Sequence, residues 1–347
     1  NVKTYTGTVD HDATAGSTQS VTWDATEDFA VNLLWVKGRS HAQAAQIADT
    51  VRGGTNTSGS GADVGMKKLQ PSANAAEVAP TANTNGGIKS IDSDGFTLLS
   101  GDDSSDRSNG TCRTSYTYVA WGWKESADAG FDIVGYTGNA TDRTISHSLS
   151  AVPKVILVKR RTDADSQWAM YHHLLTNNNF LVLNTDGASG TTDHWNDTDP
   201  TSSVFSINSS GDEVNVNTST YIAYLWSEKQ GYSKFGSYVT NNSTNGPFCW
   251  CGFRPAFLMV KFSSQTGPWI MVDNKRDPFN QMDAMVRADT TAAEADTSGV
   301  DFDFLSNGFK VRGTSGWINE PAGSTICYMA FAEAPFVNSN GVPCNAR

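Results

Sequence analysis

Long hydrophobic runs and charged residues are both scarce in this sequence. No run of 18 apolar residues occurs, so no segment is expected to span a membrane, and no signal peptide is recognised. Charged residues make up 18% of the chain, and 36 acidic against 25 basic residues give a net charge of −11. Nucleic acids and anionic membranes attract clustered positive charge, so neither is an expected partner.

Catalytic and cofactor signatures are missing as well. The sequence contains no Gly-x-Ser-x-Gly elbow, no P-loop, no dinucleotide fingerprint and no His-Glu-x-x-His. The carboxylates lie mainly in polar loops, where nothing raises their pKa values as a glycosidase pair would require. We therefore expect a protein that is not an enzyme and that binds no cofactor and no metal.

Small polar and aromatic residues take the place of the charges. The chain of 347 residues has 31 Gly and ten Trp, and aromatics make up 10% of it. This composition is typical of all-β extracellular or virion-type proteins, and it argues against a helical cytosolic enzyme and against disorder. The first residue is Asn1 rather than Met, which indicates a processed, trimmed or partial product.

The five cysteines give a weak disulfide framework because their number is odd and their spacing irregular. Cys249 and Cys251 would share one face of a strand, where neighbouring thiols rarely bridge, and no second Cys pair follows to complete a zinc site. Buried free thiols are the favoured interpretation; a disulfide or a metal site is the less favoured alternative.

Three landmarks recur in the same order along the chain: a Tyr, an apolar run ending in Val-Lys, and a closing aromatic strand. The apolar runs end at Lys37, Lys159 and Lys261. The first tyrosine precedes that lysine by 23 residues in the second and third copies, at Tyr136 and Tyr238. The closing strands contain these motifs: Tyr118-Val-Ala-Trp121, Tyr221-Ile-Ala-Tyr224 and Tyr328-Met-Ala-Phe331. The pattern predicts three tandem units at 1–127, 128–229 and 230–336, followed by a tail at 337–347.

Each unit has the pattern of a β-sandwich. Val155-Ile-Leu-Val158 is continuously apolar and β-branched, as in a central strand covered on both faces, whereas Phe131–Tyr136 alternates like a half-buried strand. We expect Val36, Val158 and Val260 in buried central strands. The predicted fold is all-β, with three sandwiches of about 100–125 residues and turns roughly every ten residues. The segments 41–51 and 280–293 are the best candidates for a short helix or an edge turn.

Two turn motifs resemble parts of metal loops. Asp92-Ser-Asp-Gly95 lacks the Glu that completes a calcium loop, and the third unit has Ser306-Asn-Gly308 at the matching place. A two-residue hairpin accounts for both motifs, whereas calcium would account for one, so we expect hairpins.

Polar insertions interrupt this pattern at 53–87, 101–109 and 187–203. The last insertion combines an aromatic ring with carboxylates and amides, which is the chemistry of a sugar site. The candidate glycan-binding residues are Asp193, His194, Trp195, Asn196, Asp197 and Asp199. The alternative is that Trp195 packs into its own sandwich and the aspartates face water.

The closing strands and the strand-end lysines suggest contacts between units or between chains. Trp121, Trp123 and Trp226 are candidates for such contacts because Trp is enriched in interfaces. The lysines at the ends of the apolar strands have two interpretations: cations that prevent edge aggregation, which is favoured, or a repeated anion or subunit contact.

The second and third units carry a more specific resemblance. Phe131-Asp-Ile-Val-Gly-Tyr-Thr-Gly-Asn139, Pro153–Lys159 and Ala330-Phe-Ala-Glu-Ala-Pro-Phe336 resemble a repeated β-rich module of tail-fibre-like and other virion proteins of marine bacteriophages. The likeness covers nearly all of 128–347 and is looser over 1–127, where the insertion departs from the pattern. The resemblance implies concanavalin-like or jelly-roll sandwiches, and it carries over no catalytic residue.

The resemblance implies a non-enzymatic virion protein on the exterior of the phage particle. The first expectation is a tail fibre or receptor-binding component that contacts the host surface, and the alternative is a capsid decoration or head-fibre protein. The implied partners are other virion proteins, further copies of the chain, with a trimer favoured, and a host surface glycan.

Overall fold

The computed structural model describes residues 1–9, 17–24, 30–55, 65–78, 86–101, 110–209 and 211–332. Within these ranges the regular structure consists of β-strands, so the expected all-β class is confirmed. The two candidate helical segments contain strands instead, β4 (Gln46–Asp49) and β21 (Ala284–Arg287). Every residue of β4 is buried and pairs with a neighbouring strand, and these tertiary contacts override the helix propensity of its Ala and Gln residues.

Three large antiparallel sheets share one strand order. The first is β1-β9-β3-β4 (Val2–Thr6, Thr117–Trp123, Leu33–Gly38 and Gln46–Asp49). The second is β10-β16-β12-β13-β14 (Phe131–Thr137, Thr220–Trp226, Val155–Arg160, Trp168–His172 and Leu181–Val182). The third is β17-β25-β19-β20-β21-β22 (Ser233–Val239, Thr325–Ala332, Pro255–Phe262, Ile270–Asp273, Ala284–Arg287 and Ala295–Asp296). In each sheet the first strand of the set pairs with the closing strand, which pairs in turn with the long apolar strand.

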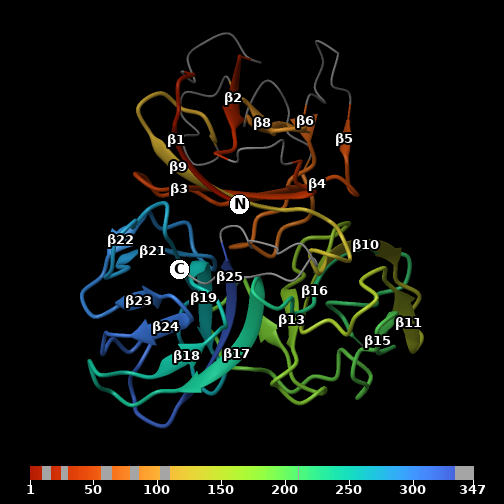
Figure 1. The fold of residues 1–347 in the computed structure, drawn as a ribbon. Helices are drawn as coiled ribbons and strands as arrows, with labels where there is room; N and C mark the ends of the chain where they lie inside the picture. Colours follow the sequence, from red (N-terminus) through yellow and green to blue (C-terminus); the bar gives the residue numbers. More distant parts are fainter. Residues whose placement is uncertain are drawn as a thin grey trace, which may run out of the picture.

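A smaller sheet belongs to each large one. These are β2-β8-β7 (Thr18–Thr22, Gly95–Leu99 and Gly87–Asp92), β11-β15 (Arg143–Ser146 and Val204–Ile207) and β18-β24-β23 (Phe248–Trp250, Gly308–Val311 and Phe302–Leu305). A further two-stranded sheet, β5-β6 (Gly54–Thr55 and Gly65–Met66), lies in the first part of the chain. Figure 1 shows the first sheet pair as the upper lobe, the second at lower right and the third at lower left.

The long apolar strands are buried because both of their faces pack. Leu33 and Trp35 face a central core, whereas Leu34 and Val36 face the core between the large and small sheets of the first pair. The same alternation holds in β12 and β19. A strand covered on both sides needs no polar face, which is why these segments are continuously apolar. The expected burial of Val36, Val158 and Val260 is confirmed, with at most 1% of each exposed.

The central core is shared by all three sheet pairs. It joins Leu33, Leu157 and Met259 with aromatic residues of every closing strand. The predicted domain boundaries at 127/128 and 229/230 fall between β9 and β10 and between β16 and β17. Removal of any one sheet pair would expose part of this common core to water.

The closing strand of the third sheet is aligned differently from the sequence motif. Tyr118 and Tyr221 pair with Tyr5 and Tyr136, but the corresponding partner of Tyr238 is Ile326. Tyr328 lies two positions further on, opposite Val260, and its ring packs edge-on against Phe309. The Tyr-x-Ala match in the third copy was therefore a shifted alignment.

The two expected hairpins are present. Ser93 and Asp94 connect β7 to β8, and Ser306 and Asn307 connect β23 to β24, so each glycine begins the second strand rather than lying within the turn. A Cβ at Gly95 would lie 2.1 Å from the Val21 carbonyl oxygen, and Gly95 has a φ of +156°. This glycine is required by close approach to the neighbouring strand.

Candidate functional site

Trp195, the aromatic residue of the candidate sugar loop, is buried. Only 1% of its surface is exposed, and its ring packs edge-on against Tyr171 with centroids 5.8 Å apart. His194 is equally buried, and this burial lowers its pKa to about 4. The aromatic face that a sugar would stack on is covered, so Trp195 packs into its own sheet pair, as the alternative interpretation expected.

The polar residues of the same loop hold its shape. Asp193 accepts hydrogen bonds from the Asp197 backbone N–H (3.0 Å) and from Nδ2 of Asn208 (2.8 Å), and Asp199 Oδ1 accepts one from the Tyr171 hydroxyl (3.4 Å). Asn196 and Asp197 have φ values of +54° and +45°, which Asn and Asp tolerate better than other residues with side chains. These contacts give the loop a structural role that sequence alone could not separate from a binding role.

The three tryptophans of the closing strands meet inside the molecule. Trp123 contacts Trp226, Phe257 and Phe331 with ring centroids 5.8–6.3 Å apart. Trp121 donates from Nε1 to Oδ2 of Asp273 at 3.2 Å. Their contacts are between sheet pairs of one chain, so these side chains are not available to bind a second copy.

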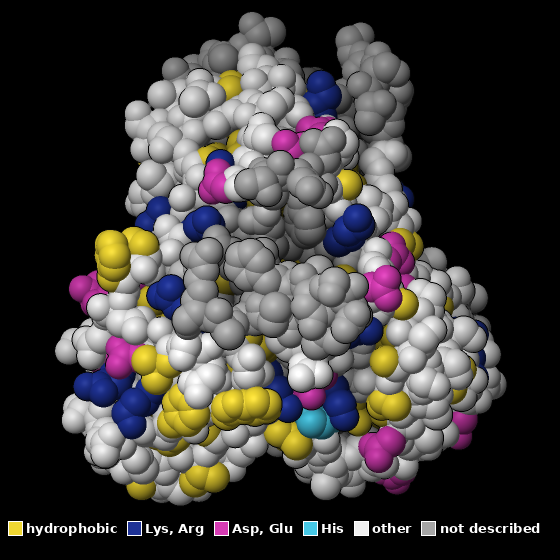
Figure 2. Space-filling model, in the orientation of Figure 1, with side chains coloured by type: hydrophobic (Ala, Val, Ile, Leu, Met, Phe, Trp, Pro, Cys, Tyr) yellow, Lys and Arg dark blue, Asp and Glu magenta, His cyan; other side chains and the backbone are white. Residues whose placement is uncertain are grey.

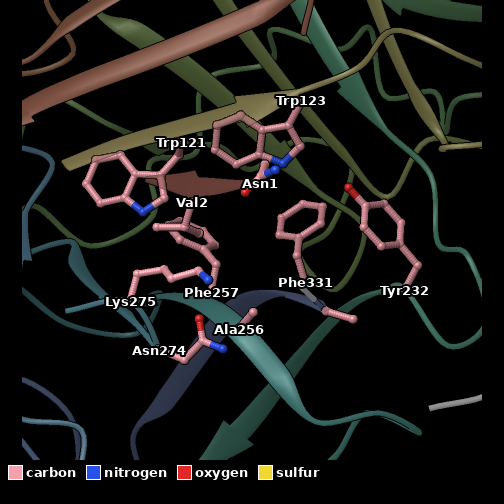
Figure 3. Close-up of a pocket in the computed structure, with 11 residues that line it drawn as sticks. Asn1, Val2, Trp121, Trp123, Tyr232, Ala256, Phe257, Asn274, Lys275 and Phe331 are labelled. Carbon is pink, nitrogen blue, oxygen red and sulfur yellow. The ribbon is translucent and has the colours of Figure 1, made fainter. Parts of the chain in front are cut away.

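A pocket opens beside this aromatic cluster. Figure 3 shows Trp121 and Trp123 on one side of it and Ala256 and Asn274 on the opposite side, with Lys275 at the margin. The pocket is small and open to solvent. Among its lining residues no nucleophile is paired with a general base, so the pocket shows no catalytic arrangement.

The three strand-end lysines are buried and connect the sheet pairs. The ammonium of Lys37 donates to the Thr290 carbonyl (2.9 Å), that of Lys159 to the Asn74 carbonyl (3.4 Å), and that of Lys261 to the Gly187 carbonyl (2.7 Å). Burial lowers the pKa of each to about 8. The favoured interpretation as edge cations was wrong, because β3, β12 and β19 are inner strands and the lysines are at most 1% exposed.

These contacts close a ring. The lysine of the first sheet pair reaches the third, that of the second reaches the first, and that of the third reaches the second. A repeated contact between different surfaces that returns to its start is a heterologous ring, here formed within one chain. The arrangement gives the molecule an approximate threefold organisation, visible as three lobes in Figure 1.

The ring has three seams, which we name by the sheet pairs that meet. At the first–second seam, Glu77 accepts from Arg161 at 2.9 Å through both carboxylate oxygens and from Arg52 at 3.2 Å, and Arg52 is paired with Asp49. Burial alone would raise the pKa of Glu77, but the two guanidinium groups hold it below its usual value. The hydroxyl of Tyr224 donates to Asp49 at 2.7 Å.

The third–first seam repeats this network. Glu294 accepts from Arg39 at 2.8 Å through both oxygens and from Arg276 at 3.2 Å, and Arg276 is paired with Asp273 at 2.7 Å. The side chains of Arg276 and Asp273 are fully buried. Trp121 donates to Asp273 as Tyr224 does to Asp49.

The second–third seam has uncharged residues at the same four positions. Strand register places His172 where the other sheets have Asp49 and Asp273, and Leu175 follows at the arginine position. The backbone N–H of Ser189 donates to the Ser263 carbonyl. The backbone N–H groups of Glu77 and Glu294 donate in the same way to the carbonyls of Arg161 and Arg39, so Ser189 and Ser263 occupy the glutamate and arginine positions. Burial lowers the pKa of His172 to about 3, so its imidazole is neutral near pH 7.

These networks are the feature that the sequence reading missed. A signal was present: Asp-x-x-Arg occurs directly after the second apolar strand at Asp49–Arg52 and again at Asp273–Arg276. Arginine also follows the strand-end lysine at Arg39 and Arg161. The recurrence can be recognised only when the strands are aligned by register.

Other reactive groups of the described residues are held in structural surroundings. Cys112, Cys249, Cys251 and Cys327 are buried free thiols, and burial raises the pKa of Cys251 to about 12 and of Cys327 to about 11; Cys344 lies outside the described residues. Burial and then the neighbouring Asp132 raise the pKa of Glu125 to about 7, at the turn between β9 and β10. In the part of the chain that the structure describes, no group of three or more His, Cys, Asp or Glu is placed to hold a metal ion. The same part has no helix of the length and apolarity that a membrane crossing requires.

A comparison with family models matches residues 1–335 to a family described as Domain of unknown function (DUF7483). The chain belongs to this family. No curated protein and no solved structure matches the chain. The DUF7483 match runs through all three sheet pairs, in agreement with a common core and a closed ring.

Proposed function

We propose that this DUF7483 protein is a non-enzymatic structural component of a bacteriophage particle. It acts on the particle exterior as a tail fibre or receptor-binding component that contacts the host surface. The motif resemblance of residues 128–347 to virion modules supports this role. The low charge content and the polar, all-β character of the chain fit the same class of protein.

The observation that carries the proposal is the use of the charged side chains inside the molecule. The three strand-end lysines are buried and bond across the seams, and the buried Arg52 and Arg276 pair with the glutamates that bond across two of them, rather than lining a reaction cleft. A closed ring with satisfied buried charges suits a protein that resists the environment outside a cell.

A homotrimer stays the expected assembly, and other virion proteins stay the expected partners. Trp121, Trp123 and Trp226 cannot provide the subunit contact, because they are occupied within the chain. Light scattering on the purified protein tests the trimer: a single mass near 37.2 kDa at micromolar concentration would contradict it.

The approximate threefold ring favours a second candidate, a decoration or head-fibre protein. One copy of a three-lobed chain could match a threefold position on a capsid exterior. Copy number on purified particles separates the candidates, since tens of copies indicate a fibre and hundreds indicate decoration.

Attachment is tested directly with the purified protein. Fluorescently labelled protein is expected to bind host cells and to slow adsorption of the phage, and incubation with host polysaccharide is expected to release no reducing ends. Absence of both cell binding and competition would contradict the attachment role, and sustained release of reducing ends would contradict the non-enzymatic one.

A further inference from the structure

The exposed aromatic rings of the described chain all border one sheet. Phe248 and Trp250 on β18 are 46% and 61% exposed, and Phe279 is 81% exposed. Phe279 precedes Asn280, whose side chain hydrogen-bonds with the backbone of Phe304 on β23, the opposite edge strand. Figure 2 shows hydrophobic side chains next to Lys and Arg on the lower part of the third lobe, where β17 and β18 lie in Figure 1.

Strand register defines the outer face of this β18-β24-β23 sheet. Cys249 lies opposite Phe309, and both are buried, so Phe248 and Trp250 project from the other face. Residues two apart on a strand are about 6.6 Å apart, so the two side chains leave β18 from neighbouring positions on one face. Trp250 lies opposite Gly308 on β24, and its indole lies against Gly252, where an added Cβ would come within 3.1 Å of Cζ2.

The other two sheet pairs provide an internal comparison. Register equates Cys249 with Val21 on β2 and Ile145 on β11, which are also buried. The flanking outward residues there carry hydroxyl groups instead of rings. They are Ser20 and Thr22 on β2, and Thr144 and Ser146 on β11. The fold therefore needs an apolar residue at the inward position and does not need aromatics at the outward ones.

Polar groups of both kinds border the rings. Lys310 lies opposite Phe248, and Asp303 lies opposite Lys310 on the next strand. Asp303 is paired with Arg312 at 3.6 Å, and the Lys310 ammonium donates to the Gly246 carbonyl at 3.1 Å. The face thus offers carboxylate acceptors and ammonium and guanidinium donors next to exposed ring faces.

The size of this face limits what it can bind. Three strands about 4.8 Å apart and about four residues long cover roughly 10 Å by 13 Å. A standard protein interface uses about 800 Å² on each partner, several times this area. One or two sugar rings fit it, because the apolar side of a pyranose stacks on an aromatic ring while its hydroxyl groups bond with flanking polar side chains.

We infer that the outer face of the β18-β24-β23 sheet binds carbohydrate, with a pyranose stacked on Trp250 and Phe248 and its hydroxyl groups bonded to Asp303 and Lys310. This inference rests on the proposed attachment role and names its ligand class. It moves the expected sugar site from the buried Trp195 of the second sheet pair to the exposed rings of the third.

The test uses surface polysaccharide extracted from host cells and the fluorescence of the full-length protein. Trp250 is the exposed tryptophan of the described residues, so stacking should shift its emission to shorter wavelength. The double variant Phe248→Ser with Trp250→Thr copies the residues of β2 and is expected to bind at least about tenfold more weakly with an unchanged melting temperature. Leu174→Ser, at a residue 48% exposed elsewhere, is the matched control and should bind normally.

Each outcome decides between the site and the wider role. If the wild type does not bind the polysaccharide but still slows phage adsorption, the carbohydrate inference fails and the attachment role stands. Binding to host cells that survives periodate oxidation of their glycans would identify a protein receptor and would overturn the inference. Equal binding by the double variant and the wild type would overturn it too; if the double variant does not fold, Trp250→Thr alone, which copies Thr22, gives the same comparison.

Discussion

Two seams of the ring contain buried ion-pair networks, whereas the second–third seam contains uncharged residues at the corresponding positions. Asp273 and Arg276 at one seam correspond to His172 and Leu175 at the other, although strand order and lysine contacts are the same. One fold thus accepts both solutions to the same packing problem. Buried ion pairs are often no more stabilising than well-packed apolar residues, but loss of one partner leaves an uncompensated charge. The comparison predicts a large cost for half-removal and a small cost for full replacement.

The largest expected effect comes from breaking one pair. Arg276→Met leaves the buried Asp273 without its guanidinium partner and leaves Glu294 with Arg39 alone. It should lower the free energy of unfolding by about 3–5 kcal/mol. Leu175→Met, at the corresponding position of the uncharged seam, should cost less than about 1.5 kcal/mol. Urea denaturation of both variants measures the difference, and equal costs would contradict the comparison.

Acid should weaken the uncharged seam first. The folded pKa of His172, about 3, lies below the ordinary value of 6.5, so the unfolded chain binds the proton first as pH falls. The free energy of unfolding then falls between pH 6.5 and 3, and about 2 kcal/mol of it is lost from pH 6.5 to 5. His172→Asn should remove this part of the pH dependence in denaturation curves at pH 5 and 7. His41, His147, His173 and His194, whose pKa values burial also lowers, add pH dependence of the same sign, whereas Glu125, whose pKa is raised to about 7, opposes it.

The lysine contacts, which all three seams share, should respond to pH in the alkaline range. A folded pKa of about 8 lies below the ordinary 10.5, so the unfolded chain keeps the proton longer and stability rises with pH between these values. Relative to Lys159→Met, the wild type should gain about 1 kcal/mol between pH 8 and 9. A difference between the two proteins that stays constant over this range would show that Lys159 titrates normally when folded.

Much of the fold follows from local patterns, and much of the ring does not. Continuous apolar strands, alternating strands and Gly-containing hairpins each predict their own structure, so Val36, Val158 and Val260 were placed correctly. Seam contacts join residues far apart in sequence, such as Arg39 with Glu294, and no local period records such a pair.

The same limit applies to the candidate site. Trp195 lies in a polar loop and Trp250 lies among cysteines and phenylalanines on a short strand, so composition would bury the wrong ring of the two. Strand register supplied the deciding fact, because it placed Trp250 on the side opposite to the buried Cys249 and Phe309. The Tyr-x-Ala motif at Tyr328 is misleading for a related reason: it matches the other copies in sequence, but its strand register differs by two residues.

Replacing a whole network should have a smaller effect than breaking it. Arg39→Ser, Glu294→Ser, Asp273→His and Arg276→Leu together convert the third–first seam to the residues of the second–third seam. No buried charge is left without its partner, so the quadruple variant should lose less stability than Arg276→Met alone, within about 2 kcal/mol of the wild type. Denaturation of the quadruple variant beside the four single ones measures the coupling. Additive costs would mean that each charge contributes independently. The uncharged residues would then be tolerated only at the second–third seam, where Met329 occupies the strand position that Trp121 has at the third–first seam.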